Sequence, residues 1–234
     1  MFIGDGYEPE TVRVFNALLK EGDEVLVCGA HQGYFVNLCS DLVGSTGRVF
    51  GYEPEPKNFS LLSEACEGLR NVDIFNFALG HKTVTAPFFI NSDNDGGHAL
   101  WDVSKHPYNV KSQRDRIAIK TQVHTIDELF ADRDMSKLKL LMLDAEGSEH
   151  AIIKGGINTI TDVAPYIICE INDPAFLQCA TSQKGLRSYL SMYGYTGYWM
   201  DVDKCVDIGT EDWVVKVDGD PVVFNVLFSR RGKV

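Results

Sequence analysis

Short apolar runs alternate along this chain with segments of helical periodicity, and this alternation constrains the fold more than any other feature. The runs predicted to be strands are 24–28, 48–52, 72–77, 140–143 and 166–171. Residues 140–143 read Leu-Leu-Met-Leu and offer no polar side chain to either face of a sheet. A strand that is apolar on both faces needs cover on both, so the pattern predicts an α/β fold with a mostly parallel sheet between two layers of helices.

The predicted helices lie between these strands. They cover 33–42, 56–66, a segment that starts near residue 148, and 184–192, and another helix at 8–19 precedes the first strand. Strand-like runs at 195–200 and 222–228 follow the last helix. Because 234 residues can build one large core and no repeat or linker divides them, we expect a single domain over 1–234, with residues 1–22 as an N-terminal helical cap.

Composition excludes several classes of protein. The net charge of −11 repels phosphate backbones, so a nucleic-acid partner is disfavoured and a cationic ligand is favoured. The sequence shows neither a basic segment before an apolar run nor about 18 consecutive apolar residues, so we expect no signal peptide, no membrane span and a cytoplasmic location. None of the six cysteines forms a C-x-x-C pair, and we expect reduced thiols.

Residues 92–116 interrupt the alternation with a polar, turn-rich segment between strand-like runs at 83–90 and 117–122. A loop of this length inside a compact domain is usually functional or mobile. His98, Trp101 and Tyr108 favour a substrate loop that folds over a ligand. The alternative is the mobile tip of a hairpin.

Ligands of such sheets bind beyond the carboxyl ends of the strands, so the residues after each strand are the candidates. After the first strand come Gly29, Ala30, His31, Gly33 and Tyr34, in a turn with too few glycines for the G-x-G-x-x-G dinucleotide pattern. The second strand is followed by Glu53, a candidate acceptor for ribose hydroxyls, with Pro54 and Asn58 nearby; Asn76 and Ala78 follow the third and could flank an adenine.

Ionisable side chains gather after the fourth strand, where Asp144, Glu146, Glu149 and His150 fall within seven residues. Asp144 and Glu146 are the stronger functional candidates, because Glu149 and His150 could face water on the next helix. After the fifth strand come Glu170, Asn172 and Asp173. A Mg²⁺ ion held by Asp144, Asn172 and Asp173 is an alternative that we do not favour.

Several segments together resemble the FkbM family of S-adenosylmethionine-dependent methyltransferases. They are VLVCGAHQGYF (25–35), GRVFGYEPEPKNFSLL (47–62), NFALG (76–80), TIDEL (125–129), LKLLMLDAEGSEHAIIKGG (138–156) and NVLF (225–228). The resemblance implies a Rossmann-like class I methyltransferase fold, with a seven-stranded, mostly parallel sheet and an antiparallel C-terminal strand. It also implies O-methylation of hydroxyls on natural products or sugars, with S-adenosylhomocysteine as the second product.

Three positions depart from the family pattern. The family's first turn usually reads D-x-G-A-N-x-G, and Val27 stands where the Asp is expected, with His31 in place of the Asn. Met142 stands where the family usually has a Lys before the acidic turn. These departures leave open a non-catalytic binding module as an alternative. An NAD-dependent oxidoreductase is a weaker alternative, since the third glycine is missing.

Methyl transfer to a small hydroxylated acceptor requires alignment of the reactants and removal of a proton. A cationic sulfonium suits the carboxylates after the strands. The cofactor-binding candidates include Asp144 together with the residues after the first three strands. The candidate catalytic bases are Asp144, Glu146, His98 and His150.

Overall fold

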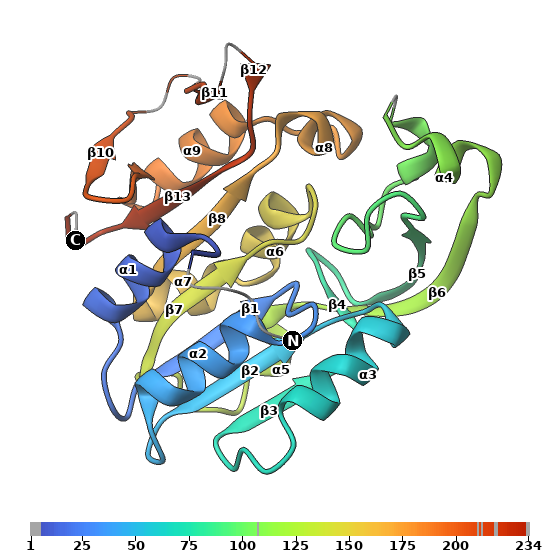
Figure 1. The fold of residues 1–234 in the computed structure, drawn as a ribbon. Helices are drawn as coiled ribbons and strands as arrows, with labels where there is room; N and C mark the ends of the chain where they lie inside the picture. The colour runs from blue at the N-terminus through green and yellow to red at the C-terminus, as the bar shows by residue number, and fades with distance from the viewer. Residues whose placement is uncertain (1–5, 107, 210, 212, 218–219, 233–234) are drawn as a thin grey trace.

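The computed structural model describes residues 6–106, 108–209, 211, 213–217 and 220–232. Within them, one sheet has eight strands in the order β10-β9-β13-β8-β7-β1-β2-β3 (Figure 1). Its strands are β1 (Glu24–Cys28), β2 (Arg48–Tyr52), β3 (Val72–Phe75), β7 (Leu138–Leu143), β8 (Tyr166–Ile171), β9 (Thr196–Met200), β10 (Cys205–Asp207) and β13 (Phe224–Ser229). Strands β3, β2, β1, β7 and β8 run parallel to one another, which confirms the predicted mostly parallel sheet.

Strand β13 is antiparallel to both of its neighbours, β8 and β9, so the predicted antiparallel C-terminal strand is confirmed. The prediction of seven strands is one short, because β10 pairs with β9 at the edge of the sheet. This extra strand is only three residues long and returns from β9 through a tight turn, in which the Asp201 N–H donates to the Lys204 carbonyl. Such a short edge strand has no apolar run that would reveal it in the sequence.

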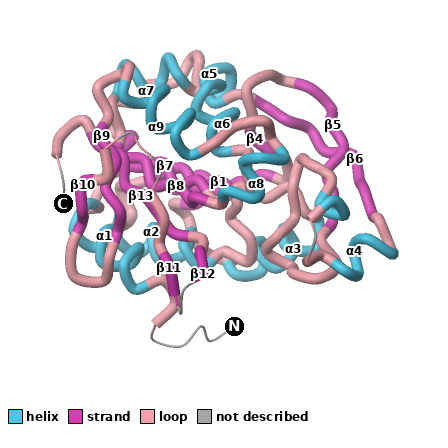
Figure 2. Tube along the Cα trace, turned by 90° about the horizontal axis from the view of Figure 1, so that it is seen from above, coloured by secondary structure: helices cyan, strands magenta, loops and turns pink. Residues whose placement is uncertain are grey.

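Two layers of helices cover the sheet, because alternate side chains of each buried strand point to opposite faces. Helices α1 (Pro9–Leu18), α2 (Tyr34–Val43) and α3 (Pro56–Ala65) pack on one face with Val25 and Val27 of β1. The other face carries α5 (Ile126–Leu129), α6 (Glu149–Gly155), α7 (Ile157–Val163), α8 (Asp173–Gln178) and α9 (Gln183–Ser191). Figure 2 shows α1, α2 and α3 on one side of the strands and α5, α6, α7 and α9 on the other.

A second sheet stands beside the first, in the order β4-β6-β5. It consists of β4 (Ala78–Leu79), β5 (Val84–Ile90) and β6 (Ile117–His124). The predicted strand 72–77 therefore ends early: β3 stops at Phe75, and the chain crosses to the second sheet at Ala78. Two short strands, β11 (Lys216–Val217) and β12 (Asp220–Pro221), form a separate pair.

The predicted loop 92–116 connects β5 and β6 and contains a 3₁₀ turn, η1 (Val103–Lys105), and a short helix, α4 (Val110–Arg114) (Figure 1). Residue 107 of this loop and residues 1–5 of the predicted N-terminal cap lie outside the described residues. The cap's helix, expected at 8–19, is observed as α1.

All six cysteines are unpaired, and five of them are buried. Among the described residues, none of the helices combines the length and the apolar character needed to span a bilayer.

Candidate active site

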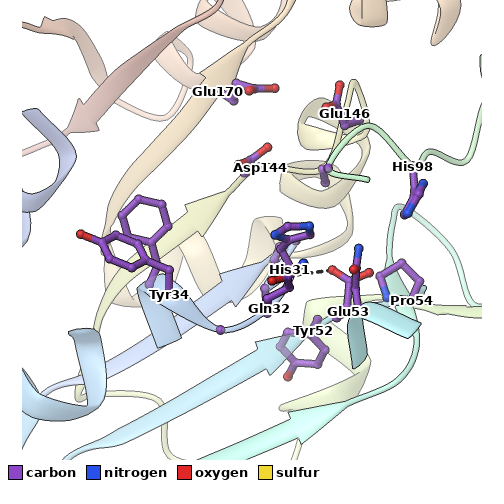
Figure 3. A pocket seen from close by; sticks show the side chains of 18 of the residues that line it. His31, Gln32, Tyr34, Tyr52, Glu53, Pro54, His98, Asp144, Glu146 and Glu170 are labelled. Atoms are coloured by element: carbon purple, nitrogen blue, oxygen red, sulfur yellow. Dashed lines mark hydrogen bonds between the residues drawn. The ribbon is translucent and has the colours of Figure 1, made fainter. Parts of the chain in front are cut away.

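A cavity of about 1010 Å³ opens at the carboxyl ends of β1, β2, β7 and β8. Pockets for small molecules usually measure about 300–1,000 Å³, so this one lies at the upper end of that range. Seven carboxylates line it: Glu8, Asp41, Glu53, Asp95, Asp144, Glu146 and Glu170. The described residues of its wall include no lysine and no arginine. In Figure 3, Asp144, Glu146 and Glu170 occupy the upper part, and Glu53 with His31 the lower part.

The turn after β1 needs glycine at two positions for different reasons. Gly29 has φ +80°, and a Cβ on it would lie 1.7 Å from the main-chain oxygen of Asp144. The close approach at Gly29 is therefore made by the neighbouring strand end, and not by a ligand alone as the sequence suggested. Gly33 has φ +95° and begins α2, and its N–H donates to the Ala30 carbonyl over 2.9 Å. Both glycines, Ala30 and Tyr34 line the cavity as predicted.

Glu53 is held in one orientation by two main-chain donors. The His31 N–H donates to Glu53 Oε2 over 2.8 Å, and the Glu55 N–H donates to Oε1 over 2.8 Å. His31 reaches this position with φ +49°, a left-handed conformation that few residues other than glycine adopt. A carboxylate has about four acceptor sites, so Glu53 keeps acceptor capacity for a ligand diol. Burial raises the pKa of Glu53 to about 7.

Apolar side chains beside Glu53 form the part of the cavity that suits an aromatic base. Pro54, Phe77, Ala78, Leu79 and Phe88 all line it. Asn58 lines it too, and its Nδ2 donates to the Asp95 carbonyl over 2.9 Å, which ties α3 to the 92–116 loop. Asn76 lies outside the wall, because its amide is turned away and donates to the carbonyl of Glu53 over 2.9 Å and of Pro54 over 3.2 Å. It fixes the backbone that carries Glu53 rather than flanking the cavity.

The acidic turn after β7 brings Asp144 and Glu146 to the wall of the cavity. Leu143 pairs with Cys169 of β8, so the next residues, Asp144 and Glu170, sit at neighbouring strand ends. Burial, and then the charge of Glu146, raise the pKa of Asp144 well above its ordinary value. Glu146 has φ +48°, and its Oε2 accepts a 3.0 Å hydrogen bond from Asn172 Nδ2. Burial raises the pKa of Glu146 to about 7.

The 92–116 loop docks onto the acidic turn. Trp101 Nε1 donates a 2.8 Å hydrogen bond to the main-chain oxygen of Glu146, and residues 94–96, 98 and 100 line the cavity. His98 Nδ1 accepts from the Asn91 N–H over 2.9 Å, so in the neutral ring the proton is on Nε2. Burial lowers the pKa of His98, which keeps the ring neutral. His98 therefore presents a donor, which suits a general base poorly.

His150, a predicted catalytic candidate, lies outside the cavity wall. Its Nδ1 is 2.6 Å from Thr181 Oγ1, and burial lowers its pKa to about 4. Glu149, which the sequence left free to face water, is instead buried: it is 0% exposed, and its Oε1 accepts from the Ala145 N–H over 2.7 Å. The first turn of α6 thus points into the protein interior.

Asn172 and Asp173, which together with Asp144 make up the alternative Mg²⁺ site, both bind neighbouring protein groups. Asn172 begins α8 and accepts from the Ala175 N–H over 3.2 Å, while Asp173 accepts from Gln183 Nε2 over 2.7 Å. Within the described part of the chain, no group of three or more His, Cys, Asp or Glu side chains is arranged to hold a metal ion.

Tyr7 and Glu8 of the N-terminal segment also line the cavity, and the sequence did not mark Glu8 as a candidate. Tyr7 packs edge-on against Tyr34 with ring centroids 5.2 Å apart. Glu8 is tied to β13, because Asn225 Nδ2 donates to its Oε2 over 2.8 Å. A contact between residues 217 positions apart leaves no local signal in the sequence.

Comparison with known proteins decides the family. The model of the "Methyltransferase FkbM domain" family matches residues 28–196. The chain belongs to the FkbM methyltransferase family. It is thus a member of a family of S-adenosylmethionine-dependent methyltransferases, as its motifs predicted. Its mostly parallel sheet with an antiparallel C-terminal strand agrees with the predicted class I fold.

One curated relative is the 2-O-methyltransferase NoeI of Sinorhizobium fredii, which is 24% identical over 152 residues. The match covers 62% of this chain and 60% of NoeI, so the chain spans less than two thirds of that protein. A solved FkbM methyltransferase from Methylobacillus flagellatus has a TM-score of 0.53 at 14% identity, over 95% of this chain and 50% of that one. A provisionally named rRNA methylase from Clostridium thermocellum has a TM-score of 0.50 at 12% identity, over 96% and 94% of the chains. These two structures show the fold alone.

Two of the three departures from the FkbM pattern, Val27 and Met142, are neighbours in the structure. Val27 of β1 pairs directly with Met142 of β7 in the parallel register. Both side chains are buried, at 1% and 2% exposure, in the apolar cluster under α1 and α2. The positions at which the family carries an acid and a base thus hold an apolar pair.

Proposed function

We propose that this chain transfers a methyl group from S-adenosylmethionine to a hydroxyl of a small molecule or sugar. One observation carries the proposal: a single cavity joins the oriented carboxylate of Glu53 to the acidic turn of Asp144 and Glu146. FkbM membership and the similarity to a 2-O-methyltransferase support it. We also expect the protein to act in the cytoplasm, which stays a prediction.

The donors and acceptors of the cavity fit S-adenosylmethionine better than a dinucleotide. Glu53 has acceptor sites left for a ribose diol, and Pro54, Phe77 and Phe88 offer apolar surface for an adenine. A pyrophosphate would be repelled by the seven carboxylates of the wall, whose described residues include neither lysine nor arginine. When bound, S-adenosylmethionine supplies an electrophilic methyl group. The same absence of positive side chains argues against an NAD-dependent oxidoreductase.

Glu146 or Asp144 would remove the proton of the acceptor hydroxyl. A general base works best when its pKa lies near the working pH, and burial raises the pKa of Glu146 to about 7. Asn172 holds the Glu146 carboxylate through Oε2, and Trp101 holds its main chain, so the group is oriented from two sides. Asp144, Glu146 and Glu170 interact with one another. Their titration should therefore show apparent pKa values that describe the three carboxyl groups together and not each residue alone.

The experiment is transfer of a labelled methyl group from S-adenosylmethionine to a panel of small hydroxylated acceptors. We expect transfer by the wild type, and a rate lower by about 10²–10⁴-fold in Glu146→Gln or Asp144→Asn. Transfer to no acceptor, by a folded protein that binds S-adenosylhomocysteine, would instead support the non-catalytic alternative. That alternative was motivated by Val27 and Met142, which the structure explains as a packed pair.

A further inference from the structure

We propose that the methyl acceptor carries a protonated amine beside its hydroxyl, as an amino sugar or amino alcohol does, and that this amine binds between Glu8, Asp144 and Glu170. The proposal rests on the proposed methyl transfer and names the class of its acceptor.

The three carboxylates lie at the end of the cavity away from Glu53. Glu53 follows β2, whereas Glu170 belongs to β8, three strands further along the sheet. Neighbouring strands are about 4.8 Å apart, which places Glu170 about 14 Å from Glu53 along the sheet edge. A ribose bound at Glu53 therefore leaves the Glu170 end of the cavity for the acceptor.

Strand register brings the three groups together. Asn225 of β13 stands opposite Glu170 of β8, and its Nδ2 also donates to Glu8 Oε2 over 2.8 Å. Asp144 sits at the strand end next to Glu170 on the other side, since Leu143 pairs with Cys169. Asp144 and Glu170 thus lie at adjacent strand ends, and Asn225 links Glu8 to the same edge of the sheet (Figure 3 shows Asp144 and Glu170).

Glu170 has an acceptor atom without a donor. Its Oε2 is buried and has no hydrogen-bond partner among the described residues, although the side chain lines the cavity. A buried carboxylate without a partner is costly, and the described wall supplies no lysine or arginine to pair with it. An ammonium group has three donors and a positive charge, which suits a part of the cavity lined by Glu8, Asp144 and Glu170.

The electrostatics of the group agree with this assignment. Burial, and then Asp144, raise the pKa of Glu170 well above its ordinary value, and Glu8 contributes in the same direction. A bound cation would favour the ionised carboxylates and reverse this shift. The ring of Tyr7, which also lines the cavity beside Tyr34, adds a face that attracts cations.

The test uses protein saturated with S-adenosylhomocysteine and two matched pairs of probes. Ethanolamine and glucosamine carry the amine; ethylene glycol and N-acetylglucosamine do not carry the charge. Binding is measured by saturation-transfer NMR and by titration, in the wild type, in Glu170→Gln, and in Asp132→Asn, which removes one exposed charge beyond the amino ends of the strands. Thermal unfolding checks that each variant is folded.

We expect the amines to bind at least about 10-fold more tightly than their neutral partners, with the preference lost in Glu170→Gln and kept in Asp132→Asn. The affinity for S-adenosylhomocysteine should be the same in all three proteins. Equal or tighter binding of the neutral probes, or no binding of any probe, would overturn the proposal. A drop in S-adenosylhomocysteine affinity in Glu170→Gln would also overturn it, because the carboxylates would then serve the cofactor's own ammonium. Failure of the wild type to bind S-adenosylhomocysteine would instead overturn the proposed function.

Discussion

The main-chain N–H of His31 donates a 2.8 Å hydrogen bond to Oε2 of Glu53, and so joins the turn after β1 to the carboxylate after β2. The left-handed conformation of His31 aims this donor, and the Glu55 N–H holds the other carboxylate oxygen. The two elements that the sequence offered as separate ligand contacts are therefore one rigid unit. It keeps its shape although the family's Asp and Asn are absent from the turn.

The buried carboxylates predict that the free protein loses stability as the pH rises from 5 to 8. Burial raises the pKa of Glu53 and Glu146 to about 7 and that of Glu149 to about 8, from 4.5. The folded state thus binds more protons than the unfolded state in this range. The stabilisation that these carboxyl groups provide is fully present below their pKa in the unfolded state. It is lost as the pH rises through their pKa in the folded state.

Thermal unfolding without ligand checks this dependence, and each kcal/mol lost should lower the unfolding temperature by about 2–4 °C. Glu149→Gln is the matched variant, because its amide oxygen can still accept from the Ala145 N–H without a titrating group. Its unfolding temperature should fall less between pH 5 and 8. A wild-type unfolding temperature that stays level or rises over this range contradicts the prediction.

The pairing of Val27 with Met142 predicts strong coupling between substitutions at the two positions. Val27→Asp and Met142→Lys each bury an unpaired charge and should each cost about 3–5 kcal/mol of folding free energy. The double variant places an ion pair across β1 and β7. Its loss of folding free energy should therefore be at least about 1 kcal/mol smaller than the sum of the losses in the two single variants. Denaturant unfolding of the four proteins measures this coupling. Strictly additive costs would mean that the two side chains do not interact.

The contact between Trp101 and Glu146 predicts that Trp101→Phe loosens the 92–116 loop. The loop contains Lys105, Lys111, Arg114 and Arg116, at which trypsin can cut once the loop opens. Losing one hydrogen bond of about 0.5–1.5 kcal/mol should speed cleavage about 2–10-fold. Tyr108→Phe is the control, since Tyr108 is 83% exposed on the same loop. Equal cleavage rates in Trp101→Phe and the wild type would show that this contact does not hold the loop.

The strand ends could be predicted because apolar runs locate buried strands, and parallel strands bring their carboxyl ends to one edge. Gly29, Glu53, Asp144 and Glu146 were found in this way. The directions of the Glu149 and His150 side chains could not be predicted, because helix packing turns the first turn of α6 toward the protein interior. Glu8 was missed for another reason: its partner Asn225 lies at the opposite end of the sequence, and only the folded sheet brings them together.

The most direct test of the account is a calorimetric titration of the free protein with S-adenosylhomocysteine at pH 8, where Glu53 is ionised. We predict binding by the wild type, and an affinity lower by about 10-fold or more in Glu53→Gln, which loses the charge-assisted bonds to the ribose diol. Asp132→Asn should bind like the wild type, and thermal unfolding should show that both variants are folded. No detectable binding by the wild type, or equal affinity in Glu53→Gln, would contradict the assignment of this cavity to S-adenosylmethionine.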